Sequence, residues 1–229
     1  MALWPLLFGG RASRAGRRLI TFAYVDGFNL YNRALKGTRY KWLDLHALIR
    51  RKIDPASEVG QIRYFTSWVS GRGDPFRTQR QQAYVRALRV GTPCPISFHF
   101  GHFLSRPISR PLVKDDKNDP DCFVWVEDTR EKGSDVNLAS HLIWDGARMA
   151  YDQAVVISKD TDLVEPIRIV RDEIRRRVGI LCPDETLSQP LQKAASFFLH
   201  IHEYEYAACQ FPPRLNTPYN KTIRRPDTW

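Results

Sequence analysis

The 229-residue sequence lacks any apolar run approaching the roughly 20 residues that a membrane-spanning helix requires. None of its four cysteines forms a C-x-x-C pair, so the spacing of a zinc ribbon is absent. Cys182 and Cys209 adjoin apolar segments and are interpreted as buried thiols, which fits a reducing compartment. A secretory signal is not indicated either, because the N-terminal apolar stretch precedes the arginines instead of following them. We therefore expect a cytoplasmic globular protein with no membrane partner.

Signatures of several enzyme classes are also missing. The chain has no G-x-S-x-G elbow and no cysteine with an evident histidine partner, which leaves a nucleophilic serine or cysteine unsupported. It has neither the G-x-G-x-x-G turn of a dinucleotide site nor a P-loop. His200 and His202 share one strand face, but zinc usually needs a third protein ligand, so we interpret them as ordinary strand histidines.

Positive charge is concentrated at the two ends of the chain. The net charge is +10. Residues 1–20 hold four basic residues and no acid, and residues 211–229 hold four basic residues and one acid. The two segments together therefore carry seven of the ten positive charges. Basic ends favour contact with phosphates. Solvated ends that only aid solubility are the alternative.

Apolar runs typical of strands alternate with segments of helical spacing. The expected strands are residues 19–25, 61–68, 96–103, 153–157, 178–181 and 197–202, and the expected helices are residues 42–53, 75–90, 135–149, 161–177 and 187–195. Ser134 is the expected N-cap of the third helix. This alternation predicts an α/β fold in three layers, a central and mostly parallel sheet flanked by helices.

The domain organisation follows from the same pattern. We expect a flexible basic leader over residues 1–18, one domain over residues 19–208, and an extended basic tail over residues 209–229. Residues 105–130 are rich in proline and charge and predict an inserted loop or hairpin.

Four aspartates should meet at one edge of this sheet. Asp26 directly follows the first strand, Asp160 and Asp162 follow the strand over residues 153–157, and Asp135 begins a helix. Open α/β sheets bind ligands at the carboxyl ends of their strands. Clustered carboxylates repel one another and must either take up protons or hold a cation, and oxygen ligands favour Mg²⁺ or Mn²⁺. An aspartate after a strand is also an ordinary turn or cap residue, which is the alternative for each one alone.

Three segments in this order resemble motifs of the NYN domain family, which belongs to the PIN-like nuclease superfamily. They are residues 24–31 (YVDGFNLY), 131–139 (EKGSDVNLA) and 155–163 (VVISKDTDL). The resemblance covers about residues 20–205 and implies a Rossmann-like PIN domain. It also implies that one site binds metal and catalyses RNA hydrolysis through Asp26, Asp135, Asp160 and Asp162.

Further residues beside the acids or on the helix over residues 75–90 are candidate RNA contacts: Asn29, Lys132, Asn137, Ser158, Lys159, Arg77 and Arg80. Lys159 stands where the family usually has glycine. Its cation could contact phosphate, which we favour, or compete with metal. For Arg77 and Arg80 a solvated helix face is the favoured interpretation.

The implied activity is that of an Mg²⁺- or Mn²⁺-dependent endoribonuclease, in which a metal-activated water cleaves the phosphodiester bond without a covalent enzyme intermediate. Two alternatives stay open. One is a non-catalytic RNA-binding or scaffold module with a PIN-like fold, and the other is a metal-dependent phosphoesterase acting on DNA or nucleotides. The motifs do not decide between endo- and exonucleolytic cleavage, and a homo-oligomer or another protein partner also stays open.

Overall fold

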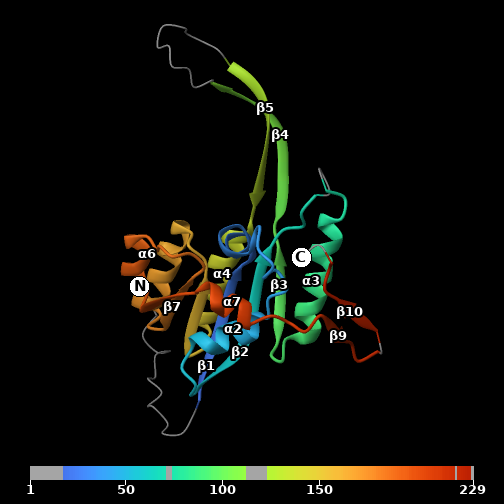
Figure 1. Ribbon diagram of the computed structural model, residues 1–229. Helices are drawn as coiled ribbons and strands as arrows, with labels where there is room; N and C mark the ends of the chain where they lie inside the picture. Colours follow the sequence, from blue (N-terminus) through green and yellow to red (C-terminus); the bar gives the residue numbers. More distant parts are fainter. Residues whose placement is uncertain (1–17, 71–73, 112–122, 220, 228–229) are drawn as a thin grey trace.

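The computed structural model describes residues 18–70, 74–111, 123–219 and 221–227. Six parallel strands form one sheet in the order β3-β2-β1-β6-β7-β8 (Figure 1). They are β1 (Leu19–Asp26), β2 (Ser57–Thr66), β3 (Ile96–Phe100), β6 (Gln153–Ile157), β7 (Arg177–Cys182) and β8 (Phe197–His200). The predicted α/β fold with a central parallel sheet is confirmed. Residues 1–17 of the expected leader lie outside the described residues.

Helices cover both faces of the sheet. One core is built from the sheet with α1 (Gly27–Leu30), the π-helix η1 (Tyr31–Leu35), α2 (Leu45–Lys52), α3 (Arg77–Gly91) and α7 (Glu203–Ala208). The other uses α4 (Ser134–Ala147), α5 (Val164–Arg168) and α6 (Gln189–Ala194). Within β1, Ala23 and Val25 enter the first core and Tyr24 the second, as the alternation of a strand requires. No helix in the described ranges is both long and apolar enough to cross a bilayer.

A long antiparallel hairpin projects from the body between β3 and α4 (Figure 1). It consists of β4 (His102–Pro111) and β5 (Phe123–Lys132), whose strands extend beyond the expected limits of 105 and 130. Residues 112–122 of the predicted insertion lie outside the described residues. The strand expected over residues 96–103 divides at Gly101. A Cβ there would lie 2.5 Å from the backbone oxygen of Lys132, so only glycine fits where the chain leaves the sheet.

The helix expected over residues 161–177 is shorter and irregular. The chain forms a 3-10 helix η2 (Thr161–Leu163), then α5, and then a π-helix η3 (Ile169–Glu173). Arg175 has a φ of 62° and turns the backbone toward β7, which starts at Arg177. Apolar residues at Ile174 and Val178 continue the spacing past η3, and such spacing gives no sign that Arg175 is left-handed.

The N-cap assigned to Ser134 was also wrong by one residue. Gly133 occupies the cap position with a φ of 98°, a conformation that glycine adopts at little cost. Ser134 is instead the first residue of α4, and its hydroxyl donates to Oε1 of Glu131 at 2.8 Å.

The C-terminal segment packs partly on the body. Residues after Pro212 form two short antiparallel strands, β9 (Arg214–Asn216) and β10 (Thr222–Arg224), beside α3. Ile223 is buried in the core that contains α2 and α3. Cys182 and Cys209 are buried, as predicted for thiols next to apolar segments.

Candidate active site

The strand order places the candidate site at a switch point of the sheet. From β1 the chain winds through β2 to β3 in one direction, and from β6 through β7 to β8 in the other. Val25 of β1 lies opposite Ile157 of β6, so the residues that follow these two strands are neighbours. Ligands of open α/β sheets bind at such a point, beyond the carboxyl ends of the strands.

A pocket of about 300 Å³ opens there. The residues that line it come from the turn after β1, from η1, from the end of β5, from the start of α4 and from the loop after β6. They are Asp26, Phe28, Asn29, Asn32, Arg33, Glu131, Ser134, Asp135 and Asp160. Three of the four predicted aspartates thus share one pocket with a further carboxylate and one guanidinium group.

Asp26 is the most enclosed of these acids, with 4% of its surface exposed. Its carboxylate accepts hydrogen bonds from the Asn29 N–H and the Ser158 hydroxyl, both at 2.9 Å. Burial raises the pKa of Asp26 from 3.8 to about 6; the two hydrogen bonds oppose the shift, and the charges of Asp135 and Asp160 add to it. Keeping Asp26 ionised in the absence of a cation therefore lowers the stability of the folded protein.

Asp135 and Asp160 face the same pocket from two different elements. Burial raises the pKa of Asp135, and the charges of Asp160, Glu131 and Asp162 raise it further. Asp160 caps η2, because its Oδ1 accepts the Asp162 N–H at 3.0 Å. Asp162 itself has an exposed side chain and is not among the residues that line the pocket. Its charge reaches Asp135, but its side chain is farther out than the sequence predicted.

The acids fit a divalent cation by their chemistry. Four carboxylates and the side-chain oxygens of two asparagines are donors that Mg²⁺ and Mn²⁺ prefer. As the side chains stand, the described residues contain no group of three histidine, cysteine or acidic side chains placed to hold an ion. Burial raises the pKa values of Asp26 and Asp135, and neighbouring carboxylates raise both further, which indicates a place for positive charge.

The raised pKa of Asp26 predicts an unusual pH dependence of stability without metal. Because its folded pKa of about 6 lies above 3.8, the folded state binds the proton more tightly. Stability should then fall as pH rises from about 4 to about 6, by up to about 3 kcal/mol from this group. Asp26→Asn should match the wild type near pH 4 and exceed it at pH 7. Urea unfolding in EDTA would measure this difference, and equal stability of the two proteins at pH 7 would contradict the assignment.

Two of the predicted RNA contacts, Ser158 and Asn29, form hydrogen bonds that hold the pocket together. Ser158 is buried, donates to Asp26, and accepts the Asp160 N–H at 3.1 Å, so one hydroxyl bridges two of the acids. The side-chain oxygen of Asn29 accepts the Lys159 N–H at 3.1 Å, which ties the turn after β1 to the loop after β6. Both residues therefore orient the acids.

The remaining predicted contacts, Lys132, Asn137, Lys159, Arg77 and Arg80, do not line the pocket. Lys159 Nζ contacts Asp184 Oδ2 at 2.6 Å and Thr186 Oγ1 at 3.0 Å. Arg80 forms an ion pair with Asp74. The side chains of Lys132 and Arg77 are exposed, and Asn137 is half-buried on α4.

Glu131, Asn32 and Arg33 line the pocket but were not predicted. Glu131 is the first residue of the second motif, four residues before Asp135, and its position in this motif is the signal that could have identified it. Its Oε1 accepts the Ser67 and Ser134 hydroxyls at 2.8 Å each. Asn32 and Arg33 are three and four residues beyond Asn29, a spacing that places helical side chains on one face and could have revealed them.

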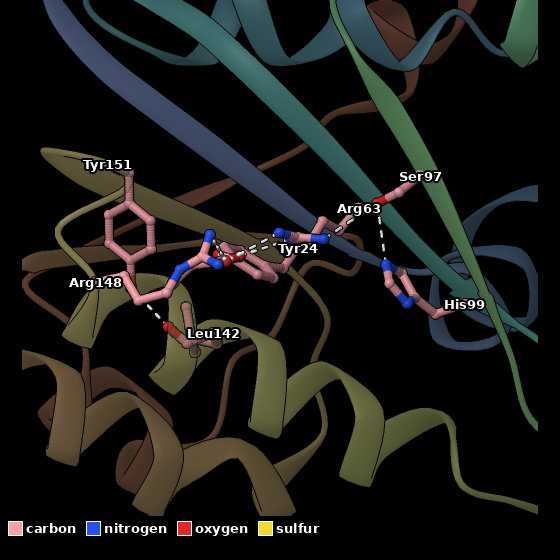
Figure 2. Close-up of polar contacts among 8 residues, drawn as sticks. Tyr24, Arg63, Ser97, His99, Leu142, Arg148 and Tyr151 are labelled. Atoms are coloured by element: carbon pink, nitrogen blue, oxygen red, sulfur yellow. Dashed lines mark hydrogen bonds and ion pairs between the residues drawn. The ribbon is translucent and has the colours of Figure 1, made fainter.

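A buried ion pair fastens α4 to the sheet (Figure 2). Arg63 of β2 donates to both oxygens of Asp145 on α4, at 2.6 and 2.9 Å, and the Tyr24 hydroxyl donates to the same carboxylate at 2.7 Å. Beyond Arg63, Ser97 contacts His99, whose pKa falls to about 4 through burial and then through His141 and Arg63. Since Asp135 lies in the first turn of α4, a network that fastens this helix to the sheet helps to position that acid.

The six-stranded parallel sheet and its acidic carboxyl edge define an α/β domain of the PIN-like kind. A family model described as "NYN domain" matches residues 20–202, and the chain belongs to this family of the PIN-like nuclease superfamily. It is 31% identical over 239 residues to 6-hydroxy-3-succinoylpyridine 3-monooxygenase HspA of Pseudomonas putida (strain DSM 28022 / S16), covering 92% of this chain and 75% of that one. A crystal structure of a protein of unknown function from Vibrio parahaemolyticus has the same fold, with a TM-score of 0.54 and 16% identity over 83% of this chain and 97% of that one.

Proposed function

We propose that this protein is a metal-dependent ribonuclease whose active site is the acidic pocket at the switch point. The observation that supports it best is the convergence of Asp26, Glu131, Asp135 and Asp160 on one pocket in a chain of a nuclease superfamily. Carboxylates so placed are costly for the fold unless they bind a cation, so the arrangement favours a functional role over a structural one.

The proposal gives each part of the pocket a task. Asp26, Asp135, Asp160 and Glu131 would hold Mg²⁺ or Mn²⁺, with Asp162 adding negative charge from outside. When bound, such an ion lowers the pKa of water and stabilises negative charge that develops on the phosphate.

Arg33 lines the pocket with an exposed side chain, and its guanidinium group would bind the phosphate group of the substrate. Ser158 and Asn29 would hold the acids in place by joining the turn after β1 to the loop after β6. The Lys159 ammonium forms an ion pair with Asp184 and would therefore stabilise the loop after β6 instead of binding the phosphate.

Cleavage of a labelled mixed-sequence RNA by the purified chain tests this function directly. We expect cutting with Mn²⁺ or Mg²⁺ and none with EDTA, since the acids then lack their counter-ion. The fragment pattern on a denaturing gel also distinguishes internal cleavage from removal of terminal nucleotides. RNA that stays intact with every metal but is bound equally well in EDTA would favour the non-catalytic binding module, and cutting of DNA alone would favour the other phosphoesterase.

A second candidate function comes from the Pseudomonas relative, whose name describes a monooxygenase acting on 6-hydroxy-3-succinoylpyridine. The alignment spans most of this chain, which favours testing the same reaction here. The acidic pocket argues for hydrolysis, since four carboxylates would repel the carboxylate of a succinoyl group unless a cation lies between them. Oxygen uptake with this substrate and a reduced nicotinamide as electron donor separates the two functions.

A further inference from the structure

A pair of aromatic rings lies beside the acidic pocket. Phe28 of α1 is half-buried and lines the pocket. Its ring contacts the ring of Phe103, the second residue of β4, with the two centroids 5.5 Å apart and the ring planes at 89°. Phe103 has 37% of its surface exposed. The acids therefore share this edge of the sheet with an apolar surface that metal binding does not use.

The register of the hairpin places Phe103 at the pocket independently of this ring contact. Phe103 lies directly opposite Glu131 in the ladder of β4 and β5. Directly opposed side chains of an antiparallel pair lie on the same face of the sheet, with their Cβ atoms about 4.5–5.5 Å apart. Because Glu131 lines the pocket, the Phe103 ring lies on the face of the hairpin that meets the carboxylates.

The base of the hairpin is fastened to the body at the residue opposite Phe103. Oε1 of Glu131 accepts the hydroxyl of Ser67, which follows β2, and the hydroxyl of Ser134, which begins α4, at 2.8 Å each. These two hydrogen bonds hold the start of the hairpin against the sheet and against α4. A ring that is held in place before a ligand arrives loses little conformational entropy on binding.

The geometry of the ring pair suits the stacking of a third ring. At 89° the two rings meet edge to face, so one of them contributes only its edge and neither of its faces is covered by the other ring. Every nucleobase has a π-face, and single-stranded nucleic acids bind aromatic side chains through it. A base inside a duplex is already stacked on its neighbours, so only an unpaired base can reach such a ring.

The charge of the pocket gives such stacking a particular use. The four carboxylates that line it repel the phosphate groups of a nucleic acid wherever no cation lies between them. Stacking on an aromatic ring involves no charged group of the protein, so it adds affinity that does not depend on a cationic side chain. An aromatic pair beside the acids can therefore retain a nucleotide that the acids alone would repel.

We propose that Phe28 and Phe103 form a nucleobase-stacking subsite, which holds an unpaired base of the RNA next to the phosphate that is cut. This subsite rests on the ribonuclease function proposed above. With Arg33 on the phosphate and the two rings on the base, the RNA is held across the acids at two points. Stacking does not read the hydrogen-bonding edge of a base, so we expect little preference among the four bases at this subsite.

Phe103→Leu tests the subsite, because leucine keeps an apolar side chain against Phe28 but has no π-face. Binding is measured with Mn²⁺ in the Asp160→Asn background, in which the RNA should stay intact. By fluorescence anisotropy with a labelled, unstructured oligoribonucleotide of mixed sequence, we expect Phe103→Leu to bind about tenfold more weakly. Phe103→Trp should bind at least as tightly as phenylalanine, since tryptophan offers a larger ring face.

Phe198→Leu is the matched control for this measurement. Phe198 is 39% exposed, close to the value for Phe103, and it lies on β8, the third strand from β1. We expect Phe198→Leu to bind RNA as tightly as the parent protein. Thermal unfolding of both variants shows whether either substitution alters the stability of the fold.

An abasic chain of the same length distinguishes stacking from a purely structural effect. It keeps the ribose and phosphate groups and lacks the bases, so Phe103→Leu should bind it as tightly as the parent protein does. A parent protein that does not bind the intact RNA would overturn the proposal. So would a Phe103→Leu variant that binds like Phe198→Leu, or one that loses the same factor with intact and abasic chains.

Cleavage by the otherwise wild-type chain separates failure of the subsite from failure of the ribonuclease function. If Phe103→Leu cuts RNA with the same half-saturating concentration as Phe198→Leu, the subsite is wrong and the ribonuclease function stands. If the wild type leaves RNA intact with every metal while the base-dependent loss of affinity persists, the hydrolysis is wrong and the base-binding subsite stands.

Discussion

Replacing Asp160 with asparagine should lower RNA cleavage by about 100-fold or more and leave the fold intact. A loss of this size corresponds to about 2.7 kcal/mol of transition-state stabilisation, within what a bound metal ion supplies. The carboxylate of Asp160 faces the pocket with Asp26 and Asp135, so its loss removes one ligand and one charge from the metal site. The fold should survive because asparagine caps helices about as well as aspartate and can still accept the N–H of residue 162.

Asp162→Asn is the matched control for this prediction. It removes the same charge two residues away, from an exposed side chain that does not line the pocket. We expect a loss of no more than about fivefold, typical of a screened charge outside the site. Single-turnover cleavage rates with Mn²⁺, together with thermal unfolding of each variant, provide the comparison. Equal losses in the two variants would support the four-aspartate site that the sequence predicted, and full activity in Asp160→Asn would exclude the pocket as the active site.

Replacing Arg63 with methionine should destabilise the protein more than any exposed substitution. Asp145 is completely buried, and Arg63 donates two hydrogen bonds to it (Figure 2). Methionine would leave this carboxylate with the Tyr24 hydroxyl and a distant contact to Arg148 at 3.7 Å. Removing one partner of a buried ion pair typically costs about 3–5 kcal/mol, because the remaining charge stays buried without compensation. Urea unfolding monitored by tryptophan fluorescence would measure the loss.

Two further variants of this protein serve as controls for the measurement. The exposed ion pair of Arg168 and Glu165 has the same type of groups at 3.2 Å, and Arg168→Met should cost less than about 1 kcal/mol. The double variant Arg63→Met with Asp145→Leu removes both buried charges and should be more stable than Arg63→Met alone. A cost for Arg63→Met as small as that of Arg168→Met would contradict a structural role for the pair.

Much of the fold could be predicted because its signals are local. Strands β1 and β6 are mostly apolar runs, of which β1 ends at Asp26 and β6 is followed by Ser158. Burial on both faces makes such runs visible in the sequence without any partner. The position of Asp26 and Asp160 at the sheet edge follows from the same fact, since each comes at or just after the end of a buried strand. For residues 105–130 the sequence predicts either a loop or a hairpin, because the side chains of β4 and β5 are mostly exposed and carry little burial pattern.

Other features depend on which strands become neighbours. Because β6 lies beside β1, the Ser158 hydroxyl reaches Asp26, which is 132 residues away in the sequence. Arg63 and Asp145 meet across 82 residues, and neither has a local pattern that predicts the other. The direction of the Lys159 side chain likewise depends on Asp184, which only the packing of the loop after β7 brings near.

The sequence by itself determined the α/β class, the parallel sheet and the edge at which the acids lie, because hydrophobic periodicity reports the burial of each segment. Only the tertiary structure decided that Glu131 and Arg33 join the pocket, that Asp162 lies outside it, and that β4 pairs with β5 in a sheet of their own. These features are contacts between segments distant in the sequence, and their free energy depends on distance and burial, which the order of the residues does not contain.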